Sequence, residues 1–429
     1  MEQKKILYMG IDLTDEQAMV SLFGRGNGRT GNHNDRSFKR AVWHSGGHVS
    51  GRFRTYFFMG KKHCGERRIL RVIFFDHLYQ RALDETESES KFYQGLLRQF
   101  VQRLIQLKDR YRFDAQELCV CITVPEITKQ VVTVFQWMCK ELGIFGEQFF
   151  LMDHGESFFG HTYHQEALLW QHDVALFDFS SEHVTFYLLH RRHGAKIQIV
   201  TAEKKMWNVP AYVHQDASVK DEFFANIIRE AFASHMISAV YFVGDGFDGD
   251  WLKESLRVLG GNKRVFLGKN LFTKGACYAG YRYTDASFWG FFYNCAYKMQ
   301  GEIRMQVQCG EENIEIRLVE AGKNWFASMP EYVLLYDGTP ELSVTIGEIG
   351  QIHAQTRVFP LTDLPDRPEK TLRFRIRALA ENGRKVVLHL EDDGFGELFE
   401  SSGKVWEFPV TFEPEEKRSL YDRKYRKNS

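Results

Sequence analysis

The sequence predicts an α/β protein with an all-β region at its C-terminal end, and three observations lead to this fold class. Two pairs of neighbouring apolar stretches, ILYMGIDL with AMVSLF and VALFDFSS with EHVTFYLLH, are typical of β-hairpins. A strand and a helix follow each hairpin further along the chain, which indicates one supersecondary unit used twice. From about residue 305, short segments of alternating apolar and polar residues replace this pattern.

Composition sets the limits for domain number and partners. A chain of 429 residues with 44% hydrophobic composition can bury a large core, and its length predicts two or three domains. The 56 basic and 56 acidic residues balance, so no nucleic-acid partner is expected. No apolar run reaches the roughly 18 residues of a membrane-spanning helix, so no membrane association is expected. The seven cysteines form no close CxxC pair, which is typical of reduced thiols and predicts a cytoplasmic protein.

Within the α/β part, apolar spacing and glycine turns mark the elements. Residues 91–110 place their apolar side chains on one broad face, which predicts an amphipathic helix. The strand LCVCITVP precedes a helix from about 128 to 142, and AVYFVGDGFDGDWLKESLRVL predicts a strand, a glycine turn and a helix. The Gly-, Asn-, Arg- and His-rich residues 24–54 predict a loop insertion, and the aromatic stretch 287–297 predicts a buried helix.

The C-terminal part predicts an all-β sandwich over residues 301–412. Its eight alternating segments are MQVQC, NIEIRLV, EYVLLYD, LSVTIGEI, HAQTRVFPL, LRFRIRALAE, KVVLHLED and VWEFPVTF. Turn signals such as YDGTPE, LPDRPEK and ENGRK separate them. Residues 413–429 predict a charged tail.

Several stretches together resemble the actin-like ATPase superfamily and, within it, the DnaK-type chaperones of the heat-shock protein 70 family. GIDL with Asp12 and LFDFSSEHVTFYLL with Asp178 look like the two phosphate motifs of that family, and CITVPEITKQVVTVFQWMCKELGI with MDHGESFFG is similar to its first connecting segment. VGDGFDGDWLKESL resembles the adenosine motif, and NLFTKGACYAG resembles the second connecting helix. PLTDLPDRPEKTLRFRIRALAENGRKVVLHLEDDGFGEL is similar to the end of the chaperone's peptide-binding sandwich.

The resemblance implies a fold and a site. The fold would be a duplicated RNase H-like, two-lobed ATPase domain over residues 1–300, with lobe I at about 1–165 and lobe II at about 166–300, followed by the sandwich. Asp12 and Asp178 would be catalytic, and in an active enzyme they would hold Mg²⁺ through water. The implied nucleotide-binding residues are Asp12, Thr14, Ser180, Ser181, Gly244, Asp245, Gly246 and Asn270. ATP with Mg²⁺ is the implied cofactor.

Both phosphate turns depart from the family pattern. Glycine and hydroxyl residues are replaced in the first turn by Thr14, Asp15 and Glu16, and the glycine run of the second turn is replaced by Ser180, Ser181 and Glu182. Two unit charges about 4 Å apart interact by roughly 1 kcal/mol in water and about 4 kcal/mol at an effective dielectric constant near 20, so added carboxylates oppose a triphosphate. The family's catalytic lysine has no clear counterpart, since the nearest candidates are His77 and Arg81. A site degenerate in this way would lose ATP and Mg²⁺.

Simpler interpretations of the same residues stay open. Asp12 and Asp178 could cap their strands without binding a ligand. Glu156 falls close to the family's coupling glutamate, but the neighbouring proline is missing. Two sets of histidines have no spacing typical of a closed metal site, so ordinary loop histidines are preferred over a metal centre. These sets are His154, His161 and His164, and His44 and His48.

The main functional hypothesis is a DnaK-like pseudo-ATPase that acts as a chaperone-like or scaffold factor. Its partner would be a polypeptide client or another protein, bound by edge addition to the sandwich or in a hydrophobic groove. One alternative is an active DnaK-type chaperone that binds and hydrolyses ATP. The other is an actin-like filament or cytoskeletal protein.

Overall fold

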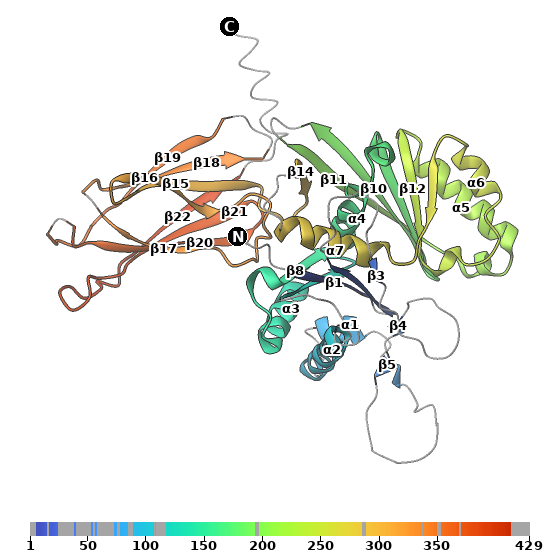
Figure 1. Cartoon of the computed structure of the whole chain (residues 1–429), viewed down its shortest axis with the longest axis horizontal. Helices are drawn as coiled ribbons and strands as arrows, with labels where there is room; N and C mark the ends of the chain where they lie inside the picture. The colour runs from blue at the N-terminus through green and yellow to red at the C-terminus, as the bar shows by residue number, and fades with distance from the viewer. Residues whose placement is uncertain are drawn as a thin grey trace, which may run out of the picture. The chain divides into compact units, whose positions relative to one another are not determined.

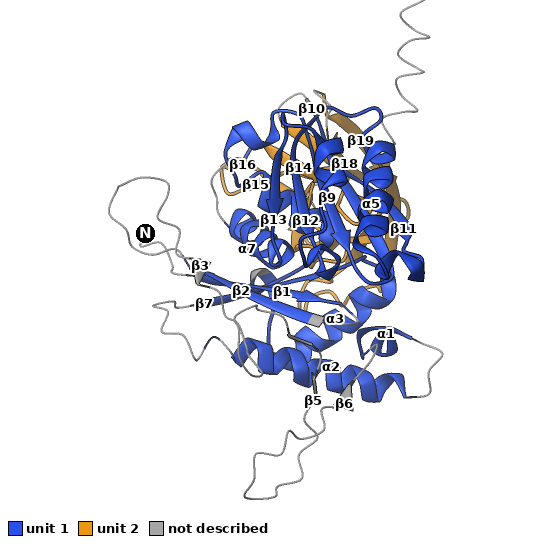
Figure 2. Ribbon diagram, turned by 90° about the vertical axis from the view of Figure 1, so that its right-hand side faces the viewer, with its two compact units in different colours: residues 1–191, 201–289 blue, residues 192–200, 290–429 orange. Residues whose placement is uncertain are grey.

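The computed structural model describes residues 6–14, 17–24, 38–39, 53–54, 56–57, 73–74, 78–84, 89–106, 108, 117–193, 197–284, 289–336, 338–349, 353–368 and 370–412. The chain forms two compact units (Figure 2). Unit 1 comprises residues 1–191 and 201–289, and unit 2 comprises residues 192–200 and 290–429. The predicted tail and most of the predicted insertion at 24–54 lie outside the described residues.

Unit 1 contains two sheets with the same strand order (Figure 1). The first sheet has the order β3-β2-β1-β7-β8 and the second the order β13-β12-β9-β10-β11-β14. Numbered within each sheet, the first five strands of both follow the order 3-2-1-4-5, and β14 (Phe291–Asn294) adds a sixth strand beside β11. In both, the first two strands form an antiparallel hairpin and the fourth strand runs parallel to the first. This duplication confirms the two-lobed, actin-like α/β fold that the sequence predicts.

The strands of the first sheet are β1 (Ile6–Leu13), β2 (Gln17–Gly24), β3 (Phe38–Lys39), β7 (Glu117–Val124) and β8 (Phe149–Asp153), and β4 (Phe53–Arg54) also pairs with β2. Those of the second sheet are β9 (Asp173–Phe179), β10 (His183–His193), β11 (Gln198–Asn208), β12 (Ile237–Val243) and β13 (Arg264–Leu267). Two short strands, β5 (Tyr56–Phe57) and β6 (Ile73–Phe74), pair with each other.

The described helices of unit 1 are α1 (Leu78–Leu83), α2 (Ser90–Ile105), α3 (Lys129–Leu142), α4 (His154–Thr162), α5 (Ala217–Ala231), α6 (Glu254–Leu259) and α7 (Leu271–Thr284). Helices α2 and α3 confirm the two predicted from apolar spacing. Helix α3 has the local signals of its ends, because the Thr128 hydroxyl accepts a hydrogen bond from the Val131 N–H and Gly143 ends the helix with φ of 68°.

Helices α4 and α7 cross at very short range between the two sheets (Figure 1). A Cβ added at Gly275 of α7 would lie 1.8 Å from the Ser157 carbonyl oxygen of α4, and one at Gly160 would lie 2.6 Å from the Gly275 carbonyl oxygen. Phe158 of α4 packs against Tyr241 of β12, with ring centroids 5.9 Å apart. The crossing therefore ties both lobes to one helix pair.

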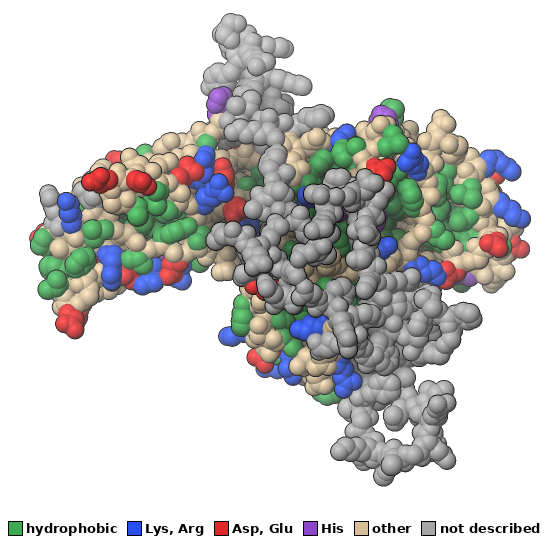
Figure 3. All heavy atoms as spheres, viewed as in Figure 1, with side chains coloured by type: hydrophobic (Ala, Val, Ile, Leu, Met, Phe, Trp, Pro, Cys, Tyr) green, Lys and Arg blue, Asp and Glu red, His purple; other side chains and the backbone are tan. Residues whose placement is uncertain are grey.

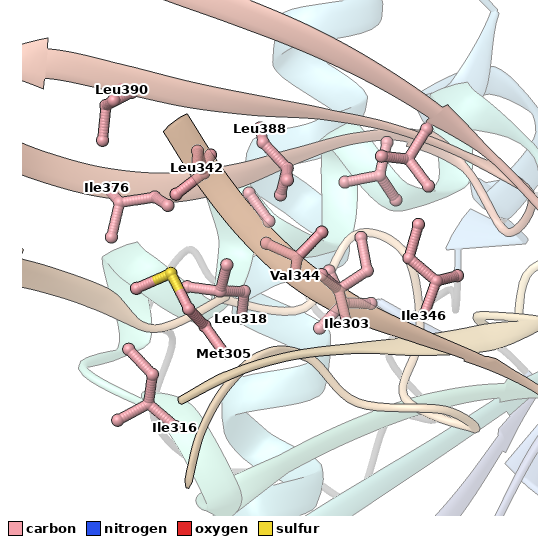
Figure 4. Close-up of a cluster of buried hydrophobic side chains, with 14 of the residues drawn as sticks. Ile303, Met305, Ile316, Leu318, Leu342, Val344, Ile346, Ile376, Leu388 and Leu390 are labelled. Atoms are coloured by element: carbon pink, nitrogen blue, oxygen red, sulfur yellow. The ribbon is translucent and has the colours of Figure 1, made fainter. Parts of the chain in front are cut away.

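Unit 2 consists mainly of two four-stranded antiparallel sheets with a shared core. One has the order β16-β15-β18-β19 and the other β17-β20-β21-β22. Figure 4 shows side chains of the two sheets, such as Met305 and Leu318 on one and Ile376 and Leu388 on the other, gathered in one cluster. All eight strands predicted from alternation are present. The likeness to the chaperone's peptide-binding sandwich stays a prediction.

The eight strands are β15 (Gly301–Cys309), β16 (Glu312–Val319), β17 (Glu331–Leu335), β18 (Glu341–Glu348), β19 (Gln355–Pro360), β20 (Arg373–Asn382), β21 (Lys385–Asp392) and β22 (Val405–Thr411). The buried helix predicted over residues 287–297 is wrong, since this stretch contains the strand β14 (Phe291–Asn294). Gly290 precedes it with φ of 78°, which interrupts a helix, and aromatic residues favour strands.

A buried ion pair fixes the loop after β21. The Arg367 guanidinium donates to both carboxylate oxygens of Asp392, at 3.0 and 2.8 Å, and the two side chains are 7% and 0% exposed. The Gly394 and Ser402 N–H groups donate to the same carboxylate, at 3.0 and 2.7 Å. Burial raises the pKa of Asp392, but the hydrogen bonds from Ser402, Gly394 and Arg367 outweigh it and hold the pKa below its usual value.

The helix crossing predicts that Gly275→Ala lowers the free energy of unfolding by about 3 kcal/mol or more, because the added methyl group meets backbone atoms of α4. Gly95→Ala in α2 is the matched control, since a Cβ there meets no atom within 4 Å. Removing a helical glycine at that position should stabilise the protein by about 0.5–1 kcal/mol. Urea unfolding of both variants measures the difference, and equal effects would contradict the tight crossing.

The buried ion pair predicts that Asp392→Asn costs about 3–5 kcal/mol at neutral pH, because Arg367 loses its charged partner. Since the folded-state pKa of Asp392 is lowered, its contribution is complete above the unfolded pKa of about 4 and is lost as pH falls through the folded value. The difference between wild type and variant should therefore shrink in acid. Glu320→Gln removes the exposed partner of Lys323 and should cost about 1 kcal/mol or less at any pH.

Candidate functional site

Asp12 lies near the end of β1 and is held by a histidine. Its Oδ1 accepts a hydrogen bond from Nε2 of His154 at 2.8 Å, and both residues are buried. His154 is the first residue of α4, whose start is capped by the Asp153 carboxylate through the Glu156 N–H at 2.6 Å. The His154 ring stacks on Phe272 of α7, with centroids 4.0 Å apart and an interplanar angle of 9°. The imidazole is therefore fixed by contacts on its edge and on its face.

Asp178 lies near the end of β9, at the position in lobe II that Asp12 has in lobe I. The glycine turn after β12 packs directly on this strand end. Gly244 has φ of 96°, and a Cβ there would lie 2.4 Å from the Phe179 carbonyl oxygen and 2.7 Å from Oδ1 of Asp178. A residue with a side chain cannot approach so closely in this conformation. The structure thus brings Asp178, Gly244 and Gly246 together, as the resemblance implies.

Two side chains of the chain itself donate hydrogen bonds to the glycine turn. The Gly246 carbonyl oxygen accepts hydrogen bonds from the Lys220 ammonium group at 2.5 Å and from the Trp251 indole N–H at 3.1 Å. The Lys220 ammonium group lies 5.0 Å from the centre of the Phe179 ring and 4.5 Å from that of Trp251. Burial lowers the pKa of Lys220. Asp245, between the two glycines, is exposed.

The N–H groups of the second phosphate turn donate hydrogen bonds to acceptors within the turn. The Ser180 hydroxyl oxygen accepts from the N–H groups of Glu182 and His183 at 3.3 and 3.1 Å, and the Ser180 N–H donates to the His183 carbonyl at 2.9 Å. The Ser181 carbonyl accepts from Nε2 of His214 at 2.7 Å. A phosphate turn needs backbone N–H groups that point at the ligand. In this conformation three of the turn's N–H groups donate to acceptors within the turn itself.

The charges of both aspartates act on one buried tyrosine. Burial raises the pKa of Tyr187 on β10 well above its usual value, and Asp178, Asp153, Asp12 and Glu126 raise it further through their charges. Phe272 packs edge-on against its ring at 6.3 Å. Asp12 and Asp178, predicted from separate motifs, therefore lie within electrostatic reach of one phenol.

The other residues predicted for the site either make local contacts or lie outside the described residues. Thr14 follows β1 and is half-buried, while Asp15 and Glu16 lie outside the described residues. Asn270 precedes α7, and its carbonyl accepts from the Thr273 hydroxyl and the Lys274 N–H, each at 3.1 Å. Arg81 donates to the Tyr93 hydroxyl at 2.8 Å. His77, the other candidate for the lysine position, also lies outside the described residues.

The histidines do not assemble a metal centre in the part of the chain that the structure describes, where no group of three or more His, Cys, Asp or Glu residues is arranged to hold a metal. His161 and His164 pack on tyrosine rings instead. Burial lowers the pKa of His161 to about 3, with smaller contributions from Lys274 and His164. Glu156 is buried and accepts a hydrogen bond from the Tyr283 hydroxyl.

The sequence did not indicate the residues that contact the predicted site residues. His154 is considered there only as a metal ligand, and Lys220, Trp251, Phe272 and Tyr187 are not singled out. Their partners are far away in the chain, as with Lys220 and Gly246 or His154 and Asp12, so no local spacing indicates them.

Two features of the whole chain accompany this site. No helix in the described ranges is both long and apolar enough to cross a membrane. Figure 3 shows acidic and basic side chains interspersed over the visible faces of both units.

Comparisons with known proteins give a family and two matched regions. Residues 54–296, more than half of the chain, match the C-terminal part of a family of unknown function, DUF5716. Residues 298–412 match a domain of unknown function, DUF8552. No curated protein matches the chain.

Similar solved structures have low identity. A Ppx/GppA phosphatase of Aquifex aeolicus is 9% identical, with a TM-score of 0.30 over 57% of this chain and 68% of that one. A Bacteroides thetaiotaomicron protein with an actin-like ATPase fold and unknown function is 6% identical, with a TM-score of 0.32 over 64% and 95%. A ROK hexokinase of Thermus thermophilus is 8% identical, with a TM-score of 0.34 over 65% and 100%. Because these TM-scores are low, the fold is assigned from the strand order of the two sheets.

The turn geometry predicts that Ser180→Ala exposes the N–H groups of Glu182 and His183 to solvent. Their hydrogen exchange should accelerate at least about tenfold, and the hairpin should lose roughly 1 kcal/mol. Ser181→Ala is the matched control, because its exposed side chain makes no hydrogen bond among the described residues. Exchange measured by NMR distinguishes the two variants, and unchanged protection in Ser180→Ala would show that the hydroxyl is not the acceptor.

Proposed function

This chain belongs to the DUF5716 family of unknown function, and we propose that it is an actin-like protein that does not hydrolyse ATP and acts as a scaffold for another protein. The observation that carries the proposal is the Ser180 turn. Hydrolysis requires donors aimed at the transferred phosphoryl group. Here a serine hydroxyl takes two of the N–H donors that the second phosphate motif would supply.

Three further features support the same proposal. Asp12, the residue that would hold Mg²⁺ through water, accepts from His154. The Gly246 carbonyl is taken by Lys220 and Trp251. Glu182 places a carboxylate in the second phosphate turn, and its charge opposes the phosphates of a nucleotide. The groups that would bind ATP and Mg²⁺ thus have partners within the chain.

Unit 2 supports the binding role. A cavity of about 400 Å³ is lined by residues of β16, of β17 and of the segment between them, including Arg317, Met329, Pro330 and Tyr332. Strands β16 and β17 each form one edge of their sheet in the described part of the chain. An edge strand can pair with an extended segment of another protein, and a neighbouring cavity can take one of its side chains. We propose a polypeptide partner for this face, in keeping with the chaperone-like hypothesis.

The rival is an active ATPase, and one observation favours it. Asp12 and Asp178 lie near the ends of equivalent strands of the duplicated fold, where the resemblance places two magnesium-directing carboxylates, and the charges of both raise the pKa of Tyr187. A filament-forming actin relative is the third candidate. Sedimentation with and without ATP tests it independently of hydrolysis.

Calorimetric titration with ATP and with ADP, each with and without Mg²⁺, tests the proposal. We expect no heat of binding up to millimolar nucleotide, because phosphate contacts worth several kcal/mol are missing and about 4 kcal/mol corresponds to a millimolar dissociation constant. Phosphate release should likewise stay at the background rate.

The control variant for this titration is Asp178→Ala. Binding tighter than about 10 μM in the wild type that disappears in Asp178→Ala would overturn the proposal and establish the ATPase alternative. Binding that persists in the variant would place nucleotide elsewhere on the chain, and would leave the cleft as the proposal describes it.

A further inference from the structure

We infer that His154 takes the place of a divalent cation at Asp12, so that the chain's own imidazole closes the position where the cation would bind. This inference rests on the proposed function, since an active ATPase would need Asp12 for hydrated Mg²⁺. The contact that carries it is the 2.8 Å hydrogen bond from Nε2 of His154 to Oδ1 of Asp12. The side chains of the two residues are 4% and 12% exposed, so little water reaches this carboxylate.

The imidazole is built into this position. His154 begins α4, and the Asp153 cap fixes the backbone there. Phe272 covers one face of the ring at 4.0 Å, and Phe272 in turn packs against Tyr187. The contacts come from α4, α7 and β10, elements of both lobes. Rotation of His154 away from Asp12 would break the stack and leave a buried carboxylate without this partner, which is costly.

The surroundings would suit a cation if the imidazole were absent. Asp12 and Asp178 lie near the ends of equivalent strands, β1 and β9, of the two sheets, and the charges of both, with those of Asp153 and Glu126, raise the pKa of Tyr187. Oxygen ligands of this kind bind Mg²⁺ and Mn²⁺. Removing the ring would leave Asp12 without its donor and open space for water and a metal ion beside it.

The test is Mn²⁺ binding to the full-length protein, with His154→Ala as the central variant. Calorimetry and the electron paramagnetic resonance signal of free Mn²⁺ both report binding without nucleotide or activity. The wild type should bind no Mn²⁺ at the cleft, whereas His154→Ala should bind one ion with a dissociation constant of about 1 mM or tighter, as few-ligand carboxylate sites do. Mn²⁺ should also raise the melting temperature of the variant and leave that of the wild type unchanged.

Two controls make the result specific. His161→Ala removes another buried imidazole from the same helix, one that packs on tyrosine rings instead of a carboxylate, and should gain no Mn²⁺ site. Asp12→Asn combined with His154→Ala should lose the site again. If His154→Ala does not fold, His154→Ser offers a smaller polar side chain that lets water satisfy Asp12, with the same expectation.

Two outcomes would overturn the inference. A folded His154 variant that takes up no Mn²⁺ would show that the cleft holds no latent cation site. Wild-type protein that binds Mn²⁺ in an Asp12-dependent way would show that His154 does not close it. Neither depends on nucleotide, so failure of the scaffold proposal in ATP titrations is distinguishable from failure here.

Discussion

The close crossing of α4 and α7 is the contact on which the α/β unit depends. Two glycines bring the helix backbones together, at Gly160 and Gly275, and each helix also packs on a sheet. Cys277 of α7 lies 3.6 Å from the Tyr8 carbonyl of β1, whereas Phe158 of α4 reaches Tyr241 of lobe II. The packing of the two helices determines where His154, the first residue of α4, meets Phe272, the second residue of α7.

The chemistry of the cleft follows from that position. Buried polar groups need partners, which are supplied either by a ligand or by the chain. In this protein the chain supplies several of them: the Ser180 hydroxyl for the second turn, His154 for Asp12, and Lys220 with Trp251 for the Gly246 carbonyl. Each internal contact stabilises the fold and removes a group that ATP or Mg²⁺ would use. A preserved fold whose site groups are hydrogen-bonded by other residues of the chain is consistent with a scaffold.

Local patterns predicted most of the fold. The two hairpins, helices α2 and α3 and all eight strands of unit 2 followed from periodicity and turn residues, because neighbouring residues determine these features. The helix predicted over residues 287–297 was wrong, because the aromatic residues of this stretch favour a strand and Gly290 has a positive φ. Asp178 and the glycine turn lie in contact, whereas the nucleotide-binding role expected for them and for Asp12 stays a prediction. His154, Tyr187 and Phe272 meet only through packing between distant elements, which sequence spacing does not encode.

The central claim is that N–H groups of the second phosphate turn already have hydrogen-bond acceptors within the chain. Hydrogen exchange of the N–H groups of residues 180–183 and 244–246, measured with and without millimolar ATP and Mg²⁺, tests it most directly. The account predicts identical exchange in the two conditions, because the N–H groups of Ser180, Glu182 and His183 already have acceptors within the turn. Slower exchange at both turns on addition of ATP would contradict the account and show that the cleft binds phosphate.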